Sequence, residues 1–210
     1  MENKKFGATI KILKKKYTAP AASDKPTPWE VLLFTLLSAR TRDEQTEIVF
    51  QRLLKKYPTA VALAEARALD VEQILKNIGL YKNKSRAVIA LAKKVHAEYH
   101  DEVPRDMESL IALPCVGRKT ASCVLVYAFR EPAIAVDTHV HRVTNRLGWV
   151  KTKNPQKTEF ALRKILPKRY WLVINRIMVQ FGRTVCIPRR PRCGVCSVRP
   201  LCDYPRKTFL

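Results

Sequence analysis

The stretch "LPCVGRKTA" at residues 113–121 joins a turn that contains Gly117 to a run with helical, apolar character. The new helix opens with Arg118 and Lys119, although the partial positive charge of a helix N-terminus normally favours Asp or Glu. Two explanations account for cations there. One is a bound phosphate, and the other is a lysine that acts as a neutral amine, the form that the same field favours.

The charge of the whole chain points to a polyanionic partner. Its 210 residues include 40 Lys and Arg against 18 Asp and Glu, a formal net charge of +22. Nucleic acid is the leading partner for such an excess, although charge alone also suits a ribosome-associated protein. No apolar run approaches the roughly 18 residues of a membrane span, and the N-terminus lacks a signal-peptide core. We therefore expect an intracellular protein that does not enter a membrane.

The apolar residues recur at helical spacing, and strand-like alternation is almost absent. The pattern predicts an all-α fold with helices at 29–39, 44–57, 82–100, 105–112, 118–129, 155–166 and 169–182. Asp70 and Gln73 have capping-box spacing, and Gly79 and Gly182 mark expected helix ends. The stretch "TAPAASDKPTP" at 18–28 predicts a linker, so that the first helix can belong to a different body from the helices that follow.

Four of the six cysteines lie close together near the C-terminus. They are Cys186, Cys193, Cys196 and Cys202, separated by six, two and five residues. Structural zinc usually uses two close pairs, whereas only one close pair is present here, and four thiolates without histidine also suit a [4Fe–4S] cluster. The spacing favours the cluster, with zinc as the competitor. The first gap holds Arg189, Arg190 and Arg192, which can contact DNA phosphates and offset an anionic cluster.

"LPCVGRKTA", "AVDTH" at 135–139 and the four-cysteine tail together resemble the endonuclease III family, the helix-hairpin-helix DNA glycosylases that carry a [4Fe–4S] cluster. The resemblance covers nearly the whole chain. It implies two α-helical domains on either side of a DNA-binding cleft. Residues 23–133 would form a six-helix barrel with the helix-hairpin-helix at about 105–130, and residues 1–22 with 134–210 would form the terminal-helices and cluster domain.

The resemblance also implies two catalytic residues. Lys119 would displace the damaged base and form a Schiff base with the sugar, after which elimination of the 3′ phosphate nicks the strand. Asp137 would face Lys119 across the cleft, assist its deprotonation and stabilise positive charge on the sugar. The plainer alternatives are a phosphate contact for Lys119 and a helix cap for Asp137. Arg118 is expected to be an ordinary cation that contacts DNA.

Other positions match expected DNA contacts. Leu80 stands at the family's wedge position, which fills the space of a flipped base, and Arg40 falls where many relatives have glutamine at the orphaned base. The N–H groups around Gly117 are expected to hold a phosphate.

Cys115 occupies a position where the family usually has glycine, so that either the turn tolerates a φ below zero there or the grip on DNA is weaker. His139 is expected to be structural or to contact DNA rather than to bind a metal with His141, because residues i and i+2 of a helix point apart.

The sequence thus predicts a monomeric, bifunctional DNA glycosylase and abasic-site lyase. Its substrate would be double-stranded DNA with a damaged base of the thymine glycol type or an abasic site. An adenine mismatch glycosylase is disfavoured by Lys119 and by the length of the chain, and a thymine or uracil mismatch glycosylase by the tyrosine that such relatives tend to carry at the lysine position. A non-enzymatic helix-hairpin-helix module would need neither Lys119 nor Asp137.

Overall fold

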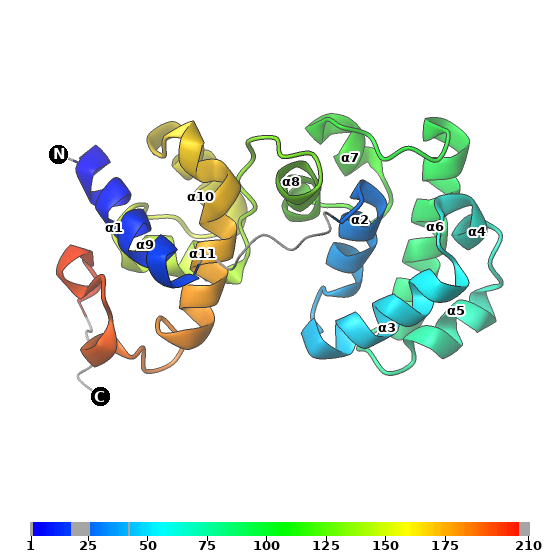
Figure 1. The fold of residues 1–210 in the computed structure, drawn as a ribbon, viewed down its shortest axis with the longest axis horizontal. Coiled ribbons are helices and arrows are strands. Elements are labelled where there is room, and N and C mark those ends of the chain that lie inside the picture. Colours follow the sequence, from blue (N-terminus) through cyan, green and yellow to red (C-terminus); the bar gives the residue numbers. More distant parts are fainter. Residues whose placement is uncertain (1, 18–25, 42, 206–210) are drawn as a thin grey trace. The chain divides into compact units, whose positions relative to one another are not determined.

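A computed structural model of the chain describes residues 2–17, 26–41 and 43–205. Within these ranges the regular elements are all helices and no strand is present, which confirms the all-α prediction. The chain divides into two compact units, drawn in Figure 1: unit 1 comprises Met1–Ser23 and Glu131–Leu210, and unit 2 comprises Asp24–Arg130. Residues 18–25 of the expected linker, and the expected domain limit after residue 22, lie outside the described residues. No helix in the described ranges has the length and apolar character needed to cross a bilayer.

Unit 2 is built around helix α2, which is apolar on almost every side. Its elements are α2 Pro28–Leu37, α3 Asp43–Lys56, α4 Ala60–Ala64, α5 Ala68–Leu75, α6 Tyr81–Tyr99, α7 Met107–Ala112 and α8 Arg118–Tyr127. Helix α2 contacts α3, α6 and α8, and Leu32, Leu33 and Leu37 are completely buried. This central position explains why α2 lacks a polar face.

Helix α5 differs from the sequence prediction at both ends. It begins at Ala68, so Asp70 is not its cap but lies in its first turn. There the Asp70 carboxylate accepts two hydrogen bonds of 3.1 Å from the Arg67 guanidinium, which hold the pKa of Asp70 below its usual value. The helix also ends at Leu75, several residues before Gly79, and in the segment that follows the Ile78 N–H donates to the Leu75 carbonyl at 3.0 Å.

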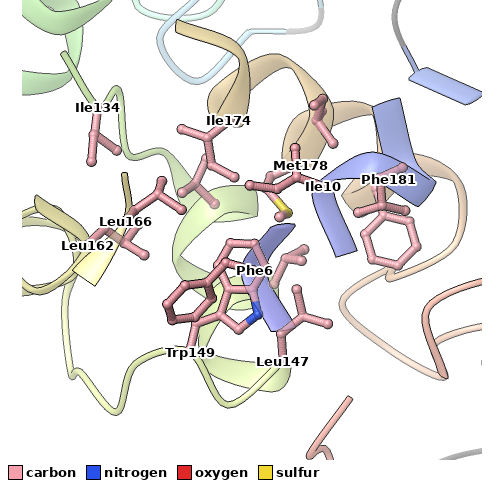
Figure 2. Close-up of a cluster of buried hydrophobic side chains, with 14 of the residues drawn as sticks. Phe6, Ile10, Ile134, Leu147, Trp149, Leu162, Leu166, Ile174, Met178 and Phe181 are labelled. Atoms are coloured by element: carbon pink, nitrogen blue, oxygen red, sulfur yellow. The ribbon is translucent and has the colours of Figure 1, made fainter. Parts of the chain in front are cut away.

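Unit 1 joins the two ends of the chain in one hydrophobic core. Its elements are α1 Glu2–Tyr17, α9 Thr138–Arg146, α10 Pro155–Ile165 and α11 Trp171–Thr184, with short 3-10 turns η1 Lys168–Tyr170, η2 Cys193–Val195 and η3 Arg199–Leu201. Figure 2 shows Phe6 and Ile10 of α1 packed among residues of α11 that include Met178 and Phe181. The Phe6 ring meets the Trp149 ring edge-on, with 5.1 Å between centroids. The first helix of the chain is therefore part of the core of the C-terminal segment.

Of two helix limits that the sequence predicted in unit 1, one is confirmed and one is wrong. Asn154 caps α10, as its sequence indicates, by accepting a 2.9 Å hydrogen bond from the Lys157 N–H. By contrast α11 continues past Gly182 to Thr184, so the predicted end at Gly182 is wrong. A Cβ at Gly182 would lie 2.8 Å from His139 Nδ1, which means that this glycine permits a close approach to α9 rather than ending a helix.

Candidate active site and cysteine loop

The hairpin between α7 and α8 obtains its sharp turn from Cys115. The Val116 N–H donates to the Leu113 carbonyl at 3.2 Å, and the Ala121 N–H donates to the Gly117 carbonyl at 3.0 Å to start α8. Cys115 adopts a left-handed backbone with φ of 59°, whereas Gly117 is extended with φ of −95°. The expectation that Gly117 makes the turn is therefore wrong, and so is the alternative in which Cys115 avoids a positive φ.

Gly117 leaves the start of α8 open. A Cβ built on it would meet no atom within 4 Å, and no side chain caps the start of α8. The first N–H groups of a helix lack partners within the helix. At this helix they are not covered by a capping side chain, which is the arrangement that lets a helix N-terminus bind an anion.

Lys119 is the second residue of α8 and is exposed, while Arg118 at the first position is half-buried. The first turn of α8 contains no acidic residue. The amine that was expected to act as a nucleophile therefore lies at the positive end of a helix, one residue beyond the first helical position.

Arg40 and Leu80 lie in two turns of unit 2 that approach each other. Both have left-handed backbones, with φ of 55° and 60°, and both side chains are exposed. A Cβ built on Gly79 would lie 3.7 Å from the Arg40 carbonyl oxygen, so the two turns are in van der Waals reach. The structure thus brings together the expected wedge and the expected reader of the orphaned base.

Asp137 is the cap of α9. Its Oδ1 accepts hydrogen bonds from the N–H groups of His139 at 2.9 Å and Val140 at 2.8 Å. The carboxylate is half-buried and held in one orientation by these bonds. Since both bonds go to Oδ1, the cap does not require Oδ2. Asp137 belongs to unit 1, and Lys119 belongs to unit 2.

His139 is half-buried and lies beside an arginine. Its Nδ1 is 3.2 Å from Arg142 Nη2. Burial lowers the pKa of His139, the charges of Arg142 and Arg183 lower it further, and Asp137 opposes them. His141 instead lies 2.6 Å from Thr158 Oγ1 through its Nδ1, which ties α9 to α10. The two histidines therefore have separate partners.

The four cysteines of the C-terminal tail line a single pocket. Successive 3-10 turns shape this loop: Cys193 begins η2, whose turn is closed by the Cys196 N–H bonded to the Cys193 carbonyl at 3.4 Å, and Cys202 follows η3. None of the four forms a disulfide within the part of the chain that the structure describes, and their pocket also contains Phe181 of the core. Among the residues that the structure describes, no three His, Cys, Asp or Glu side chains come close enough to hold one metal ion. The cysteines thus surround a space instead of converging on a point.

The surroundings of Cys196 disfavour its thiolate. Burial raises the pKa of the Cys196 thiol, a backbone hydrogen bond from Val198 opposes this, and the other three cysteines raise the pKa further. At one corner of the pocket, Arg146 Nη1 lies 3.5 Å from Cys186 Sγ and donates to that sulfur. Anionic sulfur here requires compensating positive charge.

Two arginines of α9 that the sequence did not single out hold the start of the cysteine loop. Arg142 donates to the Cys186 carbonyl from Nε at 3.1 Å and from Nη2 at 3.0 Å. Arg146, one turn further on, donates to the carbonyls of Ile187 and Pro188, both at 2.7 Å. Among forty lysines and arginines they looked like ordinary surface charges, and the only local signal was that the two lie four residues apart on the helix that follows Asp137.

Arg189, Arg190 and Arg192 are exposed on the segment between the first two cysteines. Arg190 has a left-handed backbone with φ of 50°, and the Arg192 N–H donates to the Val185 carbonyl at 3.0 Å. The backbone of this segment is fixed while its three cations face solvent.

Comparisons with known proteins agree with this arrangement. Residues 33–168 match the family described as HhH-GPD superfamily base excision DNA repair protein. Endonuclease III of Thermotoga maritima is 44% identical over 90% of this chain and 88% of its own, and endonuclease III of Escherichia coli is 38% identical over 86% of each chain.

Solved structures give the same result. A trapped covalent intermediate of endonuclease III with DNA, in an estranged-adenine complex, has a TM-score of 0.87 at 36% identity and covers 96% of this chain and 95% of its own. A thermostable thymine-DNA glycosylase has a TM-score of 0.85 at 24% identity over 99% and 98% of the two chains, which shows a shared fold. The chain therefore belongs to the endonuclease III family of helix-hairpin-helix base excision DNA repair proteins.

Proposed function

We propose that this enzyme removes oxidised pyrimidines of the thymine glycol type from duplex DNA and nicks the resulting abasic site. Membership in the endonuclease III family makes it a DNA glycosylase and abasic-site lyase. The observation that carries the proposal is the exposed Lys119 amine in the uncapped first turn of α8, directly after the hairpin. A relative with the same fold has been solved as a covalent intermediate with DNA, which supports a covalent mechanism.

We assign the covalent chemistry to Lys119. Its neutral Nζ forms a bond to the sugar C1′ while the bond from C1′ to the base breaks, and the base leaves with that electron pair and takes up a proton. Opening of the sugar ring then gives a Schiff base. Loss of a proton from C2′ expels the 3′ phosphate, which breaks the strand by β-elimination.

Asp137 is the proposed partner of this lysine. In this role it takes the proton that the Lys119 ammonium must lose and stabilises the positive charge that grows on the sugar. Its carboxylate is already oriented by the two N–H groups at the start of α9. A charged group fixed in advance stabilises a transition state without a further cost of reorganisation.

The proposed DNA contacts use exposed groups on both units. The N–H groups around Gly117, with Arg118, hold a phosphate, and His139 is a further candidate contact. Leu80 is 54% exposed, which is unusual for a leucine and suits a wedge that enters the space of a flipped base. Arg40 meets the base that is left behind, and Arg189, Arg190 and Arg192 contact the backbone. Strong positive charge makes this binding sensitive to salt.

We propose that Cys186, Cys193, Cys196 and Cys202 hold a [4Fe–4S] cluster. The fit rests on an all-thiol donor set that lines one pocket and on the Arg146 donor beside Cys186. A cluster of several irons is larger than a single ion and needs ligands that surround a space. When bound, it cross-links the loop that carries the three exposed arginines. Purified protein should be brown and contain iron and sulfide, and a colourless, zinc-loaded, active protein would contradict this assignment.

We also propose that unit 2 is the six-helix barrel domain of the family and unit 1 its cluster domain. The hairpin belongs to unit 2, and the cysteine loop belongs to unit 1. We expect the enzyme to act inside the cell as a monomer, bound to double-stranded DNA.

Borohydride reduction during turnover tests the catalytic assignment. Wild-type protein should form a covalent adduct with duplexes that contain thymine glycol or an abasic site, because the reductant fixes the Schiff base. Lys119→Ala should form none, whereas Lys93→Met, which removes an exposed lysine of α6, should react as the wild type does. An adduct that persists in Lys119→Ala would assign the chemistry to another residue. Duplexes with uracil or with A·8-oxoguanine, assayed alongside, separate this substrate class from mismatch repair.

A further inference from the structure

Lys84 is a lysine with little access to solvent. It lies in the first turn of α6 and is only 6% exposed, and burial lowers the pKa of its ammonium. Its Nζ donates to the Leu37 carbonyl at 2.7 Å and to Thr41 Oγ1 at 2.6 Å. A buried lysine is costly unless it is hydrogen-bonded, and both of these acceptors belong to the same short segment.

That segment, residues 37–41, leads out of α2. The Leu37 carbonyl belongs to the last turn of α2, where carbonyls lack partners within the helix and a cation is favourable. Thr41 closes the far end of the segment, since its N–H donates to the Ser38 carbonyl at 3.1 Å. Lys84 therefore fastens both ends of the turn that carries Arg40, which has the left-handed φ of 55°. A left-handed residue other than glycine is strained and persists only where surrounding contacts hold it.

The backbone of Lys84 secures the second turn. Its N–H donates to the Leu80 carbonyl at 2.9 Å, which is the first bond of α6. Leu80 is also left-handed, with φ of 60°, and a Cβ at Gly79 would lie 3.7 Å from the Arg40 carbonyl. A single residue thus closes the Leu80 turn with its main chain and the Arg40 turn with its side chain.

We propose that Lys84 is a positioning residue. It holds the Arg40 turn and the Leu80 turn in a fixed arrangement, so that both act together when a base is extruded from the duplex. The inference rests on the proposed function, in which both residues touch DNA. Lys84 itself is buried and contacts no DNA. It fixes the separation of the two side chains, so that the wedge enters the base stack while the arginine meets the orphaned base. The specificity for the base opposite the lesion then depends on Lys84, although Lys84 does not contact that base.

Two variants and one control separate positioning from general stability. Lys84→Met keeps the apolar stem and removes the ammonium, while Thr41→Val keeps the charge and removes one acceptor. Lys93→Met removes an exposed lysine from the same helix and serves as the matched control. If Lys84→Met does not fold, Thr41→Val still removes the hydrogen bond between Lys84 Nζ and Thr41 Oγ1, at a residue that is only partly buried.

The first measurement compares a step that needs base extrusion with one that does not. Single-turnover excision of thymine glycol from a duplex should fall about tenfold in Lys84→Met, as expected for the loss of hydrogen bonds from a charged group, and less in Thr41→Val. Nicking of an abasic site in single-stranded DNA should keep the wild-type rate, because no base has to leave a stack. Lys93→Met should match the wild type in both assays. An equal fall in both rates, or an unchanged duplex rate in both variants, would overturn the proposal.

The second measurement needs no catalysis. A duplex with a tetrahydrofuran abasic analogue carries 2-aminopurine in the opposite strand, and its fluorescence rises when the opposite base is unstacked. Saturating wild-type protein should raise this fluorescence, and saturating Lys84→Met should raise it much less. An equal rise would refute the positioning role. A wild-type protein that fails to nick would instead refute the proposed function, while this readout would still decide the role of Lys84.

Discussion

Cys115 adopts a backbone conformation that a residue with a Cβ rarely takes. Its φ of 59° lies in the left-handed region, where steric contact between Cβ and the carbonyl costs roughly 1 kcal/mol for residues other than glycine. Cys115→Gly removes this cost. The greater entropy of glycine in the unfolded chain offsets part of the resulting gain in stability. We expect the free energy of unfolding to rise by up to about 1 kcal/mol, measured by urea denaturation. Cys115→Ala, which keeps the Cβ, should leave it unchanged, and equal values for Gly and Ala would show that the turn is unstrained.

Gly117, two residues later, has no such backbone strain, and its substitution tests DNA binding rather than stability. Its φ of −95° suits any residue, and an added Cβ would meet no protein atom within 4 Å. Gly117→Ala should therefore introduce no strain, and the free energy of unfolding should not fall but rise by up to about 1 kcal/mol, because alanine has less entropy than glycine in the unfolded chain. Because the methyl group would fill open space beside the helix start that is proposed to hold a phosphate, we expect weaker binding to duplex DNA, measured by fluorescence anisotropy at fixed salt. Unchanged binding would remove Gly117 from the proposed phosphate site.

The contact between α9 and α11 depends on Gly182, a glycine in the last turn of α11. A Cβ at Gly182 would lie 2.8 Å from His139 Nδ1 and 3.0 Å from Arg142 Nη2, so these side chains would have to move. Arg142 also holds the Cys186 carbonyl, and its displacement would loosen the start of the cysteine loop. We expect Gly182→Ala to lower the free energy of unfolding by about 1–3 kcal/mol, as overpacking does in other cores. Gly79→Ala is the control, because its Cβ would make only an ordinary contact of 3.7 Å, and equal effects of the two would refute this account.

Helix limits could be predicted from sequence where local chemistry sets them. Asn154 followed by proline starts α10 as expected, because the cap needs only neighbouring atoms. Asp70 and Gly182 misled the prediction, since an acidic residue near a helix start and a glycine near a helix end each have a second use. Asp70 pairs with Arg67 inside α5, and Gly182 admits a neighbouring helix. Local patterns do not distinguish these uses, because the deciding atoms come from elsewhere in the fold.

The residues of the candidate site likewise fall into those that could be placed from local sequence and those that could not. Lys119 and Asp137 could be placed at helix starts from sequence alone because each lies in a short motif with a fixed relation to its helix. The contacts of Lys84, Arg142 and Arg146 could not be predicted, since the backbone carbonyls that they bind are at least 40 residues away in sequence and basic residues are abundant in this chain. Their role depends on burial and on backbone carbonyls, neither of which leaves a pattern in the sequence. The positions of Lys119 and Asp137 at helix starts were therefore predictable, and the contacts of Lys84, Arg142 and Arg146 with distant backbone carbonyls were not.

The two ends of the chain meet in unit 1. Helix α1 supplies Phe6 and Ile10 to a core that otherwise comes from residues after 130, and Lys5 pairs with Asp203 at 2.6 Å just beyond the last cysteine. Unit 2 has its own core, which includes the fully buried Leu53. A unit with its own core can open separately from the rest of the chain. Amide exchange should therefore report the two units individually.

Ile10→Ala and Leu53→Ala test this division with matched substitutions. Each removes a large side chain that is at most 1% exposed, and each should cost about 2–5 kcal/mol in its own unit. Hydrogen exchange should accelerate in α9 and α11 for Ile10→Ala while α2 and α6 keep their wild-type rates, although Ile10 is more than 120 residues from α9 in sequence. Leu53→Ala should give the reverse pattern. Acceleration of α2 and α6 by Ile10→Ala to the same extent as α9 and α11 would show instead that the chain unfolds as one cooperative body, with α1 belonging to no separate core.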